Sequence, residues 1–120
     1  MIEEWRIVNI DDGYFDNKYS VSSFGRIRNN DTGDLVTQGE IKGGYLRVNL
    51  YPRNKAKGGG KKRLVHRIVA FAFLSDTYID GITTDVNHID GNKHNNNADN
   101  LEWVTNQQNR NQFKSILRFF

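Results

Sequence analysis

The chain of 120 residues contains no cysteine and a single proline. Without cysteine the fold cannot depend on disulfides, and zinc sites with cysteine ligands are excluded. No apolar run approaches the roughly 20 residues that span a bilayer, so we expect no membrane partner. The N-terminal residues also lack the basic start and apolar core of a signal peptide, and we therefore expect a cytoplasmic protein.

The sequence contains no internal repeat and no interdomain linker. Hydrophobic residues make up 37% of the chain and aromatic residues 12%. A chain of this length and composition can bury one core, so we predict a single domain over residues 1–120.

Positive charge is concentrated in the middle of the chain. Residues 45–75 contain eight basic residues and no acidic one, while the segments on both sides carry more acidic than basic residues. Such a segment indicates a surface that binds a polyanion, most often nucleic acid, although a solvated lysine-rich hairpin fits the charge equally well. The candidate phosphate contacts are Arg47, Arg53, Lys55, Lys57, Lys61, Lys62 and Arg63.

The N-terminal half is predicted to be β-rich. Apolar and polar residues alternate over residues 45–51, which is typical of an antiparallel strand with one solvated face. Residues 64–74 are apolar with helical spacing and predict a buried helix. Gly58, Gly59 and Gly60 predict a flexible loop between these two elements.

Residues 85–111 hold two of the three histidines and nine asparagines. We predict a strand over residues 84–89, a polar loop, a second strand over residues 101–105 and a helix from residue 106. This order would bring the imidazole of His88 close to Asn109. An imidazole can take a proton from water at neutral pH, and amide oxygens suit magnesium or manganese.

Two other interpretations of this segment compete with a metal site. A calcium loop is excluded because Gly91 comes one residue too late and no glutamate closes the loop. A purely structural asparagine-rich loop remains open, and spacing alone favours it.

Residues 86–109, VNHIDGNKHNNNADNLEWVTNQQN, closely resemble the HNH motif of the phage and intron-encoded homing endonuclease family. The likeness extends upstream: Glu4-Trp5 and residues 19–28 are similar to the EW…YxVSxxGRIR element that precedes HNH in phage endonucleases. Residues 44–50 and 65–73 are similar to the intervening hairpin and helix.

The resemblance implies an α+β fold, with antiparallel β-hairpins and a helix followed by a C-terminal ββα-metal motif. It implies that His88 is the general base and that Asn100 braces the loop that orients it. Asn109 corresponds to a metal ligand. Asn87 departs from the family, because several members carry an aspartate ligand at this position.

The function implied is a DNA endonuclease, of nicking or homing type, that acts on double-stranded DNA with one Mg²⁺ or Mn²⁺ per site. The alternative is a DNA-binding or regulatory module with a degenerate HNH site. A homodimer and a phage protein that supplies specificity are further expectations, as is the cytoplasm of a bacterial host if a phage encodes the chain. The domain then divides into four parts. Residues 1–52 form a β-rich part that contacts DNA, residues 53–63 a flexible basic loop, residues 64–83 a helix with its linker, and residues 84–118 the ββα-metal motif.

Three further residues are given structural roles. His66 is expected to be a structural histidine whose hydrogen bonds are satisfied. Trp103 is expected to pack in the core of the motif. His94 is expected to be solvated in the loop.

Overall fold

The computed structural model describes residues 2–107, and every structural statement below concerns this part of the chain. The strands are antiparallel and form two three-stranded sheets and one hairpin. The first sheet contains β1 (Trp5–Ile7), β2 (Tyr19–Ser22) and β3 (Ile27–Asn29). The second contains β4 (Gly39–Glu40), β5 (Leu46–Leu50) and β6 (Lys61–Leu64).

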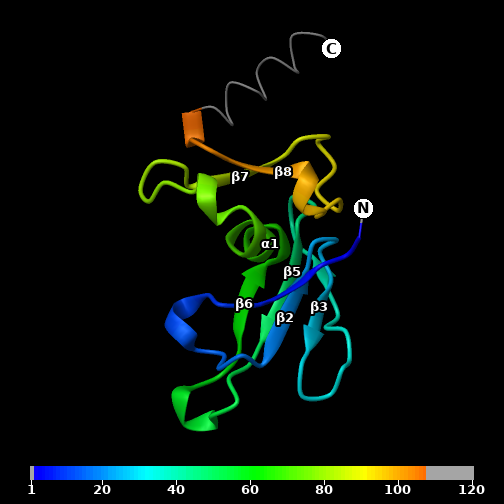
Figure 1. Cartoon of the computed structure of the whole chain (residues 1–120), viewed down its shortest axis with the longest axis vertical. Coiled ribbons are helices and arrows are strands. Elements are labelled where there is room, and N and C mark those ends of the chain that lie inside the picture. The colour runs from blue at the N-terminus through cyan, green and yellow to red at the C-terminus, as the bar shows by residue number, and fades with distance from the viewer. Residues whose placement is uncertain (1, 108–120) are drawn as a thin grey trace.

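The helix α1 (Val65–Phe73) follows β6 without a loop, and the hairpin of β7 (Asp85–His88) and β8 (Leu101–Val104) comes last. Figure 1 shows α1 between this hairpin on one side and the strands β2, β5 and β6 on the other. The fold class predicted from the sequence, α+β with antiparallel hairpins, is confirmed. Within residues 2–107 we find no helix that has the length and apolar character needed to cross a membrane.

The helix forms because its nine residues contain neither glycine nor proline and are almost all apolar. Its buried side chains, among them Ile68, Val69 and Ala70, meet β2, β5 and the last hairpin in one continuous core. Burial of a side chain such as Ile68 contributes about 1.5–3 kcal/mol to the free energy of unfolding. The core therefore joins the N-terminal sheets to the last hairpin through α1.

The alternation predicted over residues 45–51 is present in β5. Val48 and Leu50 are fully buried, whereas Asn49 is exposed. The predicted loop of residues 53–63 contains a short 3₁₀ helix, Lys55–Lys57, and is shorter than predicted, because residues 61–63 pair with β5 as part of β6. Residues 106 and 107 are helical, as predicted for the start of the last helix, and the rest of that predicted helix lies outside the described residues.

Candidate active site

His88 is the last residue of β7, on the face of the hairpin that packs against α1. Its side chain is buried, and Asn87, its neighbour along the strand, is paired with Glu102 of β8. The ring of His88 lies 5.0 Å from the ring of His66 on α1 and 6.0 Å from the ring of Tyr45, which precedes β5. Rings from two other parts of the chain therefore lie beside this imidazole.

The Nε2 atom of His88 lies 2.7 Å from Oδ1 of Asn96, which is itself buried. Because an amide oxygen can only accept, Nε2 carries the hydrogen and Nδ1 carries the lone pair. Burial lowers the pKa of His88 below its ordinary value, although the bond to Asn96 and the charge of Asp90 act in the opposite direction. The imidazole is thus neutral at neutral pH, the form that accepts a proton.

Sequence reasoning missed Asn96. It lies in a run of three asparagines, Asn95, Asn96 and Asn97, which differ in no property that a sequence pattern reports. Only the folded loop separates them: Asn96 is 3% exposed and faces His88, while Asn95 binds Asp90 and Asn97.

Asn100 lies at the end of the loop that connects β7 to β8. Its Oδ1 accepts from the backbone of Asp90, and its Nδ2 donates to the carboxylate of Asp90 and to the carbonyl of Asn95. The hydrogen bond from Asn95, followed by those from the backbone of Asn92 and from Asn100, lowers the pKa of Asp90. These contacts hold the loop together next to His88. The bracing role that the sequence predicts for Asn100 stays a prediction, and its contacts support it.

Asn87 points its amide group at the facing strand. Its Nδ2 donates to Oε1 of Glu102 at 2.9 Å, so Oδ1 is the atom of this amide that could bind a cation. An amide oxygen beside a carboxylate suits a divalent cation with oxygen ligands, such as Mg²⁺ or Mn²⁺. Within residues 2–107 no three His, Cys, Asp or Glu side chains form a metal cluster, so such an ion would need amide ligands as well. Asn109, the other predicted ligand, lies outside the described residues.

Trp103 is buried in the core, as predicted, and His66 is buried as well. The prediction that the hydrogen bonds of His66 are satisfied is wrong, because its buried Nδ1 has no hydrogen-bond partner among residues 2–107. Burial, followed by the proximity of His88 and of Arg67, lowers the pKa of His66 to about 4. The indole of Trp103 packs 4.9 Å from the ring of Phe71.

The loop between β7 and β8 also contacts the segment around β4. His94, predicted to be solvated, is exposed, and its Nε2 lies 2.5 Å from Oε1 of Glu40. Lys93 donates to the carbonyl of Gly43 at 2.6 Å and lies over the ring of Tyr45. This loop is therefore attached to the second sheet as well as to its own hairpin.

Three of the seven predicted DNA contacts are already paired with carboxylates. Arg53 binds Asp31 at 2.5 Å. Lys57 binds Asp16 at 3.0 Å, and Arg63 binds a carboxylate of the 3₁₀ helix Asp11–Gly13 at 2.9 Å. These pairs tie the basic loop to the turns of the first sheet. Within residues 2–107 no carboxylate forms an ion pair with the other four, namely Arg47, Lys55, Lys61 and Lys62.

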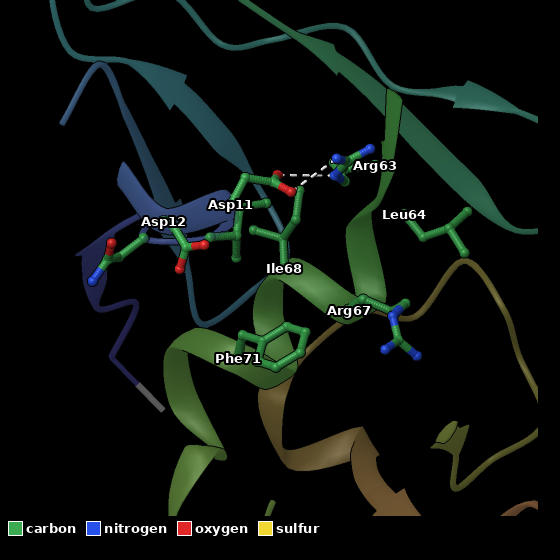
Figure 2. A pocket seen from close by; sticks show the side chains of 9 residues that line it. Asp11, Asp12, Arg63, Leu64, Arg67, Ile68 and Phe71 are labelled. Atoms are coloured by element: carbon green, nitrogen blue, oxygen red, sulfur yellow. Dashed lines mark hydrogen bonds and ion pairs between the residues drawn. The ribbon is translucent and has the colours of Figure 1, made fainter. Parts of the chain in front are cut away.

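A pocket of about 460 Å³ lies between α1, β6 and the segment that follows β1. Figure 2 shows the ion pair of Asp11 and Arg63 at this pocket, with Ile68, Phe71 and Arg67 on α1 beside it. His88 does not line the pocket, which is therefore separate from the candidate active site.

A two-stranded hairpin with a buried histidine at the end of its first strand corresponds to the two strands of a ββα nuclease motif. The family models agree with this correspondence: residues 3–51 match the NUMOD4 motif and residues 63–111 match the HNH endonuclease model. The chain belongs to the HNH endonuclease family, of the homing-endonuclease type.

Curated relatives include a phage enzyme and two viral proteins. The chain is 37% identical over 107 residues to the DNA endonuclease I-HmuI of Bacillus phage SP01, a match that covers 88% of this chain and 55% of that one. It is 36% identical over 107 residues to the uncharacterized HNH endonuclease L247 of Acanthamoeba polyphaga mimivirus, covering 89% of this chain and 25% of the relative. The chain thus spans between a quarter and just over half of the length of the curated relatives it matches.

The fold is also similar to a solved structure. The chain matches the HNH homing endonuclease I-HmuI, in a structure of DNA binding and cleavage, with a TM-score of 0.77 and 35% identity. The match covers 93% of this chain and 58% of that one. The N-terminal sheets and the last hairpin therefore belong to one shared arrangement.

Proposed function

We propose that the protein is a metal-dependent DNA endonuclease that hydrolyses phosphodiester bonds in double-stranded DNA. The observation that carries this proposal is the position of His88: it is buried at the end of β7, and its Nε2 lies 2.7 Å from Oδ1 of Asn96, so that Nδ1 is the atom that can accept a proton. General-base catalysis by such a group contributes roughly 10²–10⁴-fold to a reaction rate.

In the proposed reaction, Nδ1 of His88 takes a proton from water as the water oxygen attacks phosphorus. The bond from phosphorus to the 3′ oxygen breaks, and the 3′ oxygen leaves and takes up a proton from solvent. Asn100 holds the loop that carries Asn96 and so keeps the imidazole in place. Asn87 and Asn109 would hold one Mg²⁺ or Mn²⁺, which would supply positive charge beside the scissile phosphate and the leaving oxygen.

Glu102 lies next to Asn87, the position at which several members of the family carry an aspartate ligand. An amide ligand contributes no charge, but the carboxylate of Glu102 lies within hydrogen-bond distance of this amide. The negative charge of this part of the site therefore comes from the neighbouring strand. The alternative function, a DNA-binding or regulatory module with a degenerate site, draws on the uncharged Asn87, and the position of Glu102 weakens it.

We propose that the seven basic residues of β5, β6 and the loop between them contact DNA. The four that form no ion pair among residues 2–107 are the strongest candidates. Residues that contact phosphates position a protein on DNA without reading sequence. Sequence specificity is assigned to a phage protein partner. One site cuts one strand, and a double-strand break would need a homodimer. The proposed location is the cytoplasm, which is that of a bacterial host if a phage encodes the chain.

A supercoiled plasmid tests this proposal. With Mg²⁺ or Mn²⁺ the protein should convert the plasmid to the nicked form, and EDTA should stop the conversion until excess metal is added. Binding of the plasmid without any cleavage, with either metal, would support the degenerate-site alternative instead. Cleavage that is indifferent to EDTA would overturn the metal-dependent mechanism.

A further inference from the structure

The turn between β2 and β3 reaches out of the first sheet and contacts the loop that follows His88. The backbone of Ala98 donates to the carbonyl of Ser23 at 2.8 Å. The turn is itself fixed, because the hydroxyl of Ser22 accepts from the backbone of Phe24 and of Arg26. The NUMOD4 motif (residues 3–51) and the HNH motif therefore meet within a few residues of Asn96.

Gly25 is the residue of this turn that lies against Asn96. Its φ of +87° is in the left-handed region, which favours glycine. A Cβ atom at Gly25 would also lie 2.8 Å from Cβ and 2.9 Å from the carbonyl oxygen of Asn96, closer than such atoms approach. The turn thus requires glycine for two separate reasons, its backbone conformation and its contact with Asn96.

Few interactions fix the orientation of the Asn96 side chain. Its Oδ1 bonds to His88, while its buried Nδ2 has no hydrogen-bond partner among residues 2–107. A displacement of its backbone or Cβ by a few tenths of an ångström is therefore passed on to the bond with Nε2 of His88. The close approach of Gly25 to Cβ and the carbonyl oxygen of Asn96 limits such a displacement towards the turn.

We propose that Gly25 is a positioning residue for His88 and acts through Asn96. The NUMOD4 motif then contributes to the chemical step, because it holds in place the Asn96 amide that orients His88. This role is in addition to any contact that the motif makes with DNA. The catalytic part of this inference rests on the proposed function, whereas the contact between Gly25, Asn96 and His88 does not.

The test compares Gly25→Ala with Gly33→Ala in the full chain. Gly33 has a φ of +80° and no atom within 4 Å of the position of its missing Cβ, so this control imposes the same backbone strain without a new contact. Two quantities are measured: kcat and KM for cleavage of a DNA duplex, and the ¹⁵N signals of the His88 ring, which report which nitrogen carries the hydrogen.

Gly25→Ala is expected to lower kcat at least tenfold with KM for DNA unchanged, and to shift the His88 ring signals away from a single Nε2–H form. Gly33→Ala is expected to leave both quantities as in the unchanged protein. Wild-type kcat and wild-type ring signals in Gly25→Ala would overturn the inference. So would an equal loss of kcat in the two variants.

Should Gly25→Ala fail to fold, Gln38→Ala takes its place. Gln38 donates to the carbonyl of Gly25 at 2.7 Å, and its removal loosens the turn without adding bulk. A severalfold fall in kcat at unchanged KM supports the inference, and an unchanged kcat overturns it. If the unchanged protein does not cleave DNA at all, the proposed function fails separately, and the ¹⁵N signals of Gly25→Ala still decide whether Gly25 positions His88.

Discussion

The side chain of Asn96 accepts a hydrogen bond from Nε2 of His88 at 2.7 Å, inside the loop that joins the strands of the last hairpin. An imidazole that donates through one nitrogen presents the other as a base, so this bond selects the tautomer that can activate water. The bond also fixes the plane of the ring. The proposed role of His88 as the base is therefore tied to an asparagine eight positions further along the chain.

Asn96→Ala should lower kcat for DNA cleavage by roughly 10²-fold, because a wrongly oriented or wrongly protonated imidazole loses most of its contribution as a base. The affinity for DNA should be unchanged. Asn30→Ala is the matched control, since the Asn30 side chain is bonded only to the carbonyl of Asn17, outside the hairpin, among residues 2–107. Equal rates for the two variants would show that Asn96 does not orient the base.

Glu102→Gln should weaken the binding of Mn²⁺ by roughly 10–100-fold, the range found when a residue behind a metal ligand is removed. The physical reason is the loss of the negative charge that lies 2.9 Å from the amide of Asn87. Calorimetric titration with Mn²⁺ measures the effect without any need for cleavage. Glu4→Gln removes an exposed carboxylate elsewhere and serves as the control. An unchanged Mn²⁺ affinity in Glu102→Gln would remove Glu102 from the metal site.

Because of His66, the free energy of unfolding should decrease in mild acid. Burial lowers its pKa from 6.5 to about 4, so between these values the unfolded chain binds a proton that the folded chain does not. The free energy of unfolding then decreases as pH falls from 6.5 towards 4, by roughly 2–3 kcal/mol between pH 7 and pH 4.5.

Urea unfolding at these two pH values measures this contribution, with His66→Leu as the comparison. The variant keeps an apolar volume in the core but carries no titrating group, so its loss of stability over the same interval should be smaller than that of the unchanged protein by this amount. Equal losses in the two proteins would mean that His66 is not held neutral by the fold.

Basic residues that form an ion pair with a carboxylate and those that form none should differ in their contribution to DNA binding. Replacing Lys62 or Arg47 with alanine should reduce the slope of log affinity against log salt by about one for each phosphate that the side chain neutralises. Arg53→Ala should reduce it less, because Arg53 already neutralises Asp31. Fluorescence anisotropy of a labelled duplex at several salt concentrations gives the slopes. A larger effect for Arg53 than for Lys62 would show that its ion pair opens on DNA.

Local pattern is sufficient to predict the elements that carry the site. The alternation over residues 45–51 predicts β5, and the apolar helical spacing over residues 64–74 predicts α1 to within one residue at each end. The strand that ends in His88 is predicted to within a residue as well. These features depend on neighbours in sequence, which is why the sequence reports them.

The contacts that position the site depend on residues distant in sequence. Gly25 and Asn96 meet only because α1 brings the first sheet and the last hairpin together, and neither residue carries a local signal of the other. The glycines of the basic loop predict flexibility from local sequence alone. Its ion pairs with Asp16 and Asp31 come from turns far upstream, and a charge count along the chain cannot assign them.

The most direct test of the proposed function is the cleavage rate of His88→Ala with Mg²⁺, measured on supercoiled plasmid together with binding of the same DNA. We expect this variant to bind DNA as tightly as the unchanged protein and to cleave it roughly 10²-fold or more slowly. A variant that binds DNA and nicks the plasmid at the unchanged rate would contradict the assignment of His88 as the base, and with it the proposed mechanism.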